Sequence, residues 1–141
     1  MLSRKKVEDI VDLLKDHKNR ENIQHAVAWL AKLFHSAPIM VYFETCEKVA
    51  NANSRRIVIC PEAISEDFQR LDSVAIPNYA ERYHVNHLCI VILHEVGHVL
   101  HRRNELPAGI IGKGEDVDRE TVANRFTEFI LHPLKEKSLK I

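Results

Sequence analysis

The segment from Asn86 to Arg103 constrains the fold more than any other part of the chain, because it predicts a helix that is apolar on most of its sides. Such a helix must be surrounded by other elements, so we expect it at the centre of the core. Its apolar residues are Leu88, Ile90, Val91, Leu93, Val96, Val99 and Leu100. The longest apolar run stops at His94, well short of the roughly 18–20 residues needed to cross a bilayer.

The segments before this helix predict the elements that cover it. Apolar residues recur at helical spacing over residues 3–17, behind a serine that can cap the helix, and again over residues 23–34. β-branched and aromatic residues gather at 39–43 and 57–60, with turn-forming residues 51–54 between them. We therefore predict two N-terminal helices followed by a small antiparallel sheet of about three strands.

The C-terminal part predicts a second helix beside the central one. After a loop with three glycines, acidic residues open a helix over 116–131, and Pro133 is expected to end it. Residues 135–140 are Lys-rich and are expected to be solvated, and 72–85 is predicted as a loop with one short helix. The predicted fold class is α+β: one compact domain, residues 1–141, in which the central helix packs on the C-terminal helix.

The net charge of the chain points to no particular class of partner. The chain carries 20 basic and 20 acidic side chains, so its net charge favours neither a nucleic acid nor a membrane surface.

The chain has three cysteines, an odd number at wide spacing: Cys46, Cys60 and Cys89. This pattern is more typical of small buried side chains in a reducing compartment than of disulfides or a zinc finger. Acidic residues interrupt the first apolar stretch, so no secretory signal is expected and we predict a cytoplasmic protein, with its oligomeric state left open.

Nine histidines are the unusual feature of the composition, and two of them form a metal-binding pattern. His94-Glu95-Val96-Gly97-His98 is the His-Glu-x-x-His pattern of zinc hydrolases, of which about 0.05 accidental matches are expected in a chain of this composition. Residues four apart on a helix differ by about 40° in direction and about 6 Å in rise, so both imidazoles can reach one ion. Glu95 lies on the adjoining side of the same turn, where it can accept a proton from a water at that ion.

A catalytic zinc also needs a third protein ligand. The extended form of the pattern would place Gly at position 101 and His at 104, whereas this chain has His101 and Asn104. His101 lies seven residues after His94, about 10 Å along a helix, which is too far for both to bind one ion. We therefore expect His101 to support or pack against the site, and the third ligand to come from the following helix.

Glu120 is the predicted third ligand. It lies 22 residues after His98, across a loop long enough to bring the next helix back antiparallel. Gly97 and Ala123 are small enough to let the two helices approach closely, and Asn124, one turn after Glu120, is placed to hydrogen-bond to a ligand. The competing acidic residues are more simply explained as stabilising the helix N-terminus; they are Glu115, Asp116 and Asp118.

Together these motifs resemble a known family. The sequence His94-Glu95-Val96-Gly97-His98-Val99-Leu100-His101, followed by Glu120-x-x-Ala123-Asn124-x-Phe126 and Leu131-His132-Pro133, is similar to the ImmA/IrrE family of small zinc metallopeptidases from bacteria and their mobile elements. The resemblance covers residues 94–133, whereas the first 85 residues agree only in the order of their elements. Thr127 and the sequence Ile130-Leu131-His132-Pro133 depart from the family's usual Ala and Leu-Leu-x-Pro, at positions expected to serve packing.

The resemblance implies a zincin-like domain in which His94, His98 and Glu120 bind one zinc ion per chain and Glu95 is the catalytic acid and base. Members of that family cleave helix-turn-helix repressors and so switch on stress-response or mobile-element genes. The resemblance therefore implies that this chain is a zinc endopeptidase whose substrate and partner is such a repressor. It also implies that the chain regulates transcription without binding nucleic acid itself.

The sequence leaves two features of the site undetermined: the donor that stabilises the oxyanion and the strand that binds the substrate. A donor should stabilise the oxyanion of the reaction, and four residues before the central helix are candidates: Tyr79, Tyr83, His84 and His87. We also expect the strand near 56–60 to lie at the sheet edge above the metal, where an extended substrate could pair with it.

Two other hypotheses compete with the zinc endopeptidase. One is a regulatory binding module that keeps the metallopeptidase fold without cutting a peptide bond. The other is a metal-free structural protein in which the motif is accidental.

Overall fold

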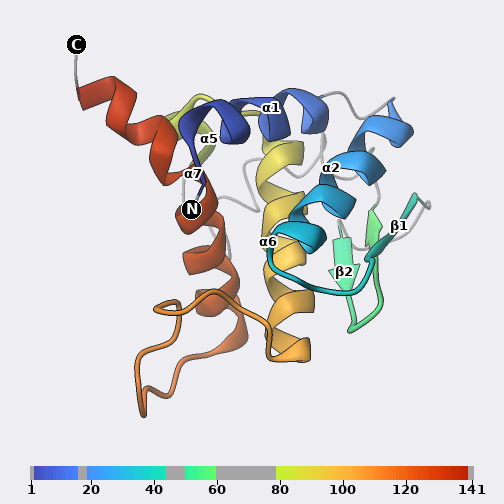
Figure 1. The fold of residues 1–141 in the computed structure, drawn as a ribbon, viewed down its shortest axis with the longest axis vertical. Helices are drawn as coiled ribbons and strands as arrows, with labels where there is room; N and C mark the ends of the chain where they lie inside the picture. The colour runs from blue at the N-terminus through green and yellow to red at the C-terminus, as the bar shows by residue number, and fades with distance from the viewer. Residues whose placement is uncertain (1, 16–18, 44–49, 60–78, 140–141) are drawn as a thin grey trace.

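The computed structural model describes residues 2–15, 19–43, 50–59 and 79–139 of the chain (Figure 1). In these ranges it has five helices and three strands: α1 (Arg4–Leu14), α2 (Arg20–Leu33), β1 (Met40–Phe43), β2 (Ala50–Ala52), β3 (Arg56–Ile59), α5 (Tyr79–Tyr83), α6 (His87–Arg103) and α7 (Arg119–Leu139). The α+β class is confirmed. Cys46, Cys60 and the first part of the predicted loop at 72–85, residues 72–78, lie outside the described residues. The short helix predicted in that segment is confirmed by α5.

The prediction of a central helix is confirmed by α6. The other described helices and the small sheet surround it (Figure 1), and all of its residues from His87 to Gly97 are buried. Asn86 begins the helix, because its side chain accepts a hydrogen bond from the backbone N–H of Cys89. Asn104 ends it in the left-handed conformation, with φ of 57°. Cys89 is fully buried, as expected for a small apolar side chain.

The two N-terminal helices also form where the apolar spacing predicts them. Ser3 caps α1 by accepting from the N–H of Lys6, and Asn19 caps α2 by accepting from the N–H of Asn22. Both helices bury their apolar stripes in the common core, with Leu14 of α1 and Leu30 of α2 fully buried. None of the described helices is long and apolar enough to span a membrane.

The predicted antiparallel sheet is wrong in its pairing. The described strands form a mixed sheet in the order β1-β3-β2, in which β1 runs parallel to β3 and β2 runs antiparallel to it. β2 and β3 form a hairpin whose turn is held by Asn53, which accepts from the N–H groups of Arg55 and Arg56. The strand predicted near 56–60 is therefore the middle of the sheet and not its edge, because β1 pairs with β3 instead of with its sequence neighbour.

Arg103 ties this sheet to the end of α6. Its guanidinium donates to the carbonyl oxygens of Ser54 (2.6 Å), Ala37 (2.6 Å) and Pro38 (3.1 Å), and to the hydroxyl of Ser36 (2.7 Å). These acceptors belong to the β2–β3 turn and to the connection between α2 and β1. A single side chain therefore holds two loops against the helix that carries the His-Glu-x-x-His motif.

The C-terminal helix differs from the prediction at both ends. It begins at Arg119 instead of 116, because Asp118 supplies the cap by accepting from the N–H of Thr121 at 2.9 Å. It also continues past Pro133 to Leu139. Proline removes one helical hydrogen bond, but Leu134 directly after it packs against the core, which favours continuing the helix.

The close approach of α6 and α7 depends on Gly97, as the sequence predicts. A Cβ atom at this position would lie 3.2 Å from the Cα of Ala123 and 3.2 Å from two side-chain atoms of Phe126. Such contacts are tighter than ordinary van der Waals packing, and both neighbours are fully buried. Any larger side chain must push the two helices apart.

We expect Gly97→Val to lower the free energy of unfolding by about 1–3 kcal/mol, the usual cost of overpacking a core. Urea unfolding monitored by circular dichroism measures this loss. Arg102→Val is the matched control, because it places the same side chain on an exposed position of the same helix. Helix propensity favours Val over Gly but disfavours Val relative to Arg, so a loss at position 97 no larger than the loss at 102 would argue that the contact with α7 does not limit the size of residue 97.

Candidate metal centre

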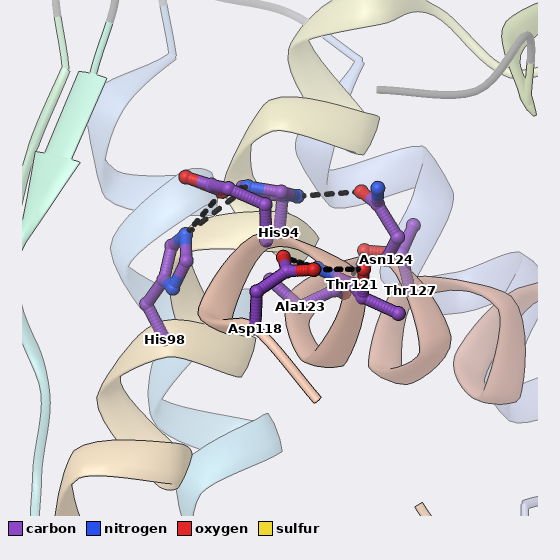
Figure 2. A network of polar contacts seen from close by, with 8 residues as sticks. His94, His98, Asp118, Thr121, Ala123, Asn124 and Thr127 are labelled. Atoms are coloured by element: carbon purple, nitrogen blue, oxygen red, sulfur yellow. Dashed lines mark hydrogen bonds and ion pairs between the residues drawn. The ribbon is translucent and has the colours of Figure 1, made fainter. Parts of the chain in front are cut away.

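Three predicted ligand atoms come together between α6 and α7 (Figure 2). The Oε2 atom of Glu120 lies 2.8 Å from Nε2 of His94 and 3.0 Å from Nε2 of His98, and the two Nε2 atoms are 3.1 Å apart. His94 is buried, His98 is partly buried and the Glu120 side chain is 55% exposed. The centre is therefore closed on the side of the core and open to solvent on the other.

Local structure explains this convergence. His94 and His98 lie one turn apart on α6 and so project from the same side of the helix. On α7, the cap formed by Asp118 sets the start of the helix, which places Glu120 in its first turn. Gly97 then allows the two helices to approach closely enough for the carboxylate to reach both rings.

Asn124 contacts the ring nitrogen of His94 that does not face Glu120 and so orients this histidine, as the sequence predicts. Its Oδ1 atom lies 2.9 Å from Nδ1 of His94 (Figure 2). An amide oxygen can only accept a hydrogen bond, so this contact requires the proton of a neutral His94 to be on Nδ1. The Nε2 atom then carries a lone pair and points toward His98 and Glu120.

This arrangement suits a cation. With the proton of His94 on Nδ1, its Nε2 atom and the Glu120 carboxylate are two acceptors only 2.8 Å apart. A positive ion between the three atoms would satisfy all of them. Ligands at 2.0–2.1 Å from a tetrahedral zinc lie about 3.3 Å from one another, which is close to the 2.8–3.1 Å separations here.

The charge states of the ligands agree with this reading. Burial, and next the neighbouring ring of His94, lower the pKa of His98, which favours the neutral imidazole that can bind a cation. Burial raises the pKa of Glu120, but the close contacts of its carboxylate with the rings of His94 and His98 outweigh this and lower the pKa overall. Neutral imidazoles and an ionised carboxylate are the forms that bind zinc.

Glu95 follows His94 on the buried side of α6, and 8% of its surface is exposed. Burial, with a smaller contribution from the Glu120 carboxylate, raises the pKa of Glu95 to about 7. A cation held by the neighbouring side chains would oppose this effect and favour the ionised form. Glu95 is therefore placed as a carboxyl group that can exchange a proton near neutral pH.

The other acidic candidates take structural roles. Glu115 forms a two-point ion pair with Arg125, with both separations 2.8 Å, and accepts from the N–H of Gly112. These contacts lower the pKa of Glu115 to about 2. Asp118 caps α7, and Asp116 is exposed. The structure thus brings Glu120, and not these neighbours, to the two histidines.

Two of the four oxyanion candidates are engaged elsewhere. The hydroxyls of Tyr79 and Tyr83 both donate to the carboxylate of Glu128, at 3.4 Å each, and Tyr79 also approaches the carbonyl oxygen of Asn124 at 3.3 Å. Sequence reasoning missed Glu128, although its position one turn after Asn124 on α7 could have indicated it. The cluster fixes α5 against α7 beside the residue that orients His94.

The three histidines near the motif lie in different surroundings. His84 is exposed, with φ of 56° just before α6, and His87 is buried in the first turn of that helix. His101 is partly buried two turns after His94. The three-residue cluster identified among the described residues does not include His101, in agreement with the spacing argument.

Comparison with known proteins gives this cluster a context. A family model, DUF4344, described as "Putative metallopeptidase", matches residues 2–138, nearly the whole chain. The chain belongs to the DUF4344 family. No curated protein and no solved structure matches it significantly. Membership supports a metallopeptidase that uses a metal ion, and His94, His98 and Glu120 form the candidate site for that ion.

For this DUF4344 member, Asn124→Leu is expected to lower zinc affinity about 10- to 100-fold, the usual effect of removing the partner that orients a metal-binding histidine. Leu keeps a similar size but cannot accept the His94 proton. Competition with a chromophoric chelator measures the affinity. His132→Leu is a matched control on the exposed side of the same helix, and an equal loss there would argue against a specific role for Asn124.

Proposed function

We propose that the chain is a zinc-dependent endopeptidase that hydrolyses a peptide bond in a protein partner. The observation that carries the proposal is the convergence of His94, His98 and Glu120 within hydrogen-bond distance, with Glu95 beside them on a buried helix. Two neutral imidazoles and one carboxylate are the ligand set of many catalytic zinc sites and leave a position for water.

Zinc bound by these residues would supply Lewis-acid chemistry, which lowers the pKa of water and polarises a carbonyl. His94 and His98 would hold the ion from the core side, and Glu120 from the solvent side, where its side chain is half exposed. Asn124 keeps the His94 lone pair directed at the ion by retaining the ring proton on Nδ1.

Glu95 would transfer a proton from the attacking water to the leaving group. Its carboxylate takes a proton from the attacking water and returns it to the nitrogen of the leaving amine, as a general base and then a general acid. Burial favours this double role, because it brings the pKa of Glu95 to about 7, where taking up and giving back a proton are both accessible.

A more specific part of the proposal concerns the substrate of this endopeptidase. The motifs between 94 and 133 resemble the ImmA/IrrE family, and this resemblance supports a helix-turn-helix repressor as substrate, with a change in transcription as the outcome. We place the reaction in the cytoplasm, where such repressors act, and assign it to a single zincin-like domain over residues 1–141. Equal numbers of acidic and basic side chains are in keeping with a protein partner instead of DNA.

The test uses the helix-turn-helix protein encoded nearest to this chain's own gene. Purified wild-type protein with zinc should convert it into two fragments whose masses sum to the intact protein plus one water. Removal of zinc with a chelator should stop cleavage, and added zinc should restore it. An intact repressor under all conditions, combined with stable complex formation, would favour the regulatory binding module over the peptidase.

A further inference from the structure

Among the described residues no strand pairs with the outer edge of β1, and this edge has features that the proposed hydrolysis does not use. β1 is an outer strand of the described sheet, and it lies on the opposite edge from β2, which packs against α6 (Figure 1). A groove of about 700 Å³ runs between this edge and α2. The residues that line it include Arg20, Glu21, Gln24, His25, Tyr42 and Phe43.

Gln24 occupies part of this edge in the way that a neighbouring strand would. Its Nε2 atom donates to the carbonyl oxygen of Ile39 at 3.0 Å, and its Oε1 atom accepts from the N–H of Val41 at 2.9 Å. A side-chain amide has the same donor and acceptor as a peptide group, so Gln24 marks where the backbone of an added strand would lie. Because strand groups alternate in direction, the carbonyl of Val41 and the N–H of Phe43 point to the same side.

Two cationic side chains flank the same end of the strand. The guanidinium of Arg20 lies 5.0 Å from the ring centre of Phe43, and that of Arg56 lies 5.5 Å from the ring centre of Tyr42. Successive side chains point to opposite faces of a strand, so one guanidinium is held on each face. Neither forms an ion pair with any residue in the described part of the chain.

We propose that this edge is a docking surface for an extended acidic segment of a protein partner, which adds to β1 as a further strand. The backbone of the segment would continue the hydrogen bonds begun by Gln24, and its carboxylates would pair with Arg20 and Arg56. Tyr42 and Met40 are 41% and 48% exposed on β1 and offer apolar contact to the intervening side chains. None of the residues that line the groove belongs to the candidate metal site, so the surface would hold a partner independently of cleavage.

The two guanidinium groups favour an acidic segment over a second copy of the chain as the occupant of this edge. Pairing β1 with β1 of another copy would bring the same guanidinium groups toward one another, which disfavours such a dimer. An acidic segment instead supplies the missing counter-charges. Glu21 is the only carboxylate among the residues that line the groove, whereas Arg20 lines it as well and Arg56 lies over Tyr42 beside it.

The test compares two fluorescein-labelled heptapeptides, Val-Glu-Val-Glu-Val-Glu-Val and the same sequence with Lys in place of Glu, by fluorescence anisotropy on the wild-type protein. Mass spectrometry checks that both probes stay intact. We expect the acidic probe to bind at least about fivefold more tightly, with an advantage that falls as salt is raised. The amide resonances of Val41 and Phe43 should shift on titration.

Matched variants locate the effect. Arg20→Met and Arg56→Met keep a long apolar side chain against each ring and remove the charge, and together they should abolish the preference for the acidic probe. Lys113→Met, a charge removal on an exposed loop, should leave it unchanged. Equal binding of both probes, an equal effect of Lys113→Met, or a dimer that forms through β1 would overturn the proposal, whereas zinc content and cleavage report separately on the metal centre.

Discussion

Glu95→Gln should lower the rate of peptide hydrolysis by about 10²- to 10⁴-fold, the range that general acid and base catalysis usually contributes. Gln has nearly the shape of Glu but cannot take up or return a proton. The three side chains that converge between α6 and α7 do not include Glu95, so the variant should still bind about one zinc per chain. Cleavage followed by mass spectrometry, together with metal analysis of the same samples, measures both quantities.

Glu105→Gln is the control for this experiment, because it makes the same change just beyond the end of α6. It should retain full activity and zinc. If Glu95→Gln cleaves as fast as the wild type, Glu95 is not the proton carrier. If it loses zinc together with activity, its role is to bind the metal instead.

Glu120→Ala is expected to have the second large effect, a loss of zinc affinity of more than about 100-fold. The carboxylate provides the only ligand atom that α7 contributes to the candidate site, at 2.8 and 3.0 Å from the two rings. Its side chain is 55% exposed, so truncation should leave the metal-free fold intact. The rise in melting temperature that zinc produces in the wild type should therefore disappear in the variant.

Two neighbouring substitutions test the specificity of this result. Asp116→Ala removes an exposed carboxylate four residues earlier and should leave zinc binding unchanged. Glu115→Ala breaks the ion pair with Arg125 and should affect the loop more than the metal. If Asp116→Ala weakens zinc binding as much as Glu120→Ala does, the general negative charge near α7 matters and not one ligand.

Much of the site was predictable because its spacing follows from helix geometry. The four-residue separation of His94 and His98 directs both rings to one side of any regular helix. Asn124 could be anticipated in the same way, since it lies one turn after Glu120, and its contact with His94 is confirmed. The small residue Gly97 also indicated the close helix contact that the structure contains.

The sheet and the role of the tyrosines could not be predicted in this way. β-branched residues indicate that a strand forms, but they do not indicate which strand lies beside it. β1 therefore pairs with β3 in parallel, which removes β3 from the sheet edge where a substrate strand was expected. Tyr79 and Tyr83 were predicted candidates for the reaction, yet a carboxylate 45 or more residues away, on Glu128, engages both.

The sequence by itself determined the apolar central helix, the pair of histidines on one of its faces and the α+β class, because each depends on periodicity within a short segment. Only the tertiary structure decided how closely Glu120 approaches those histidines, how the three strands pair, and that within the described residues β1 is an outer strand beside two arginines that form no ion pair there. These features join residues that are far apart in the chain. Their geometry follows from how whole elements pack, which no local pattern records.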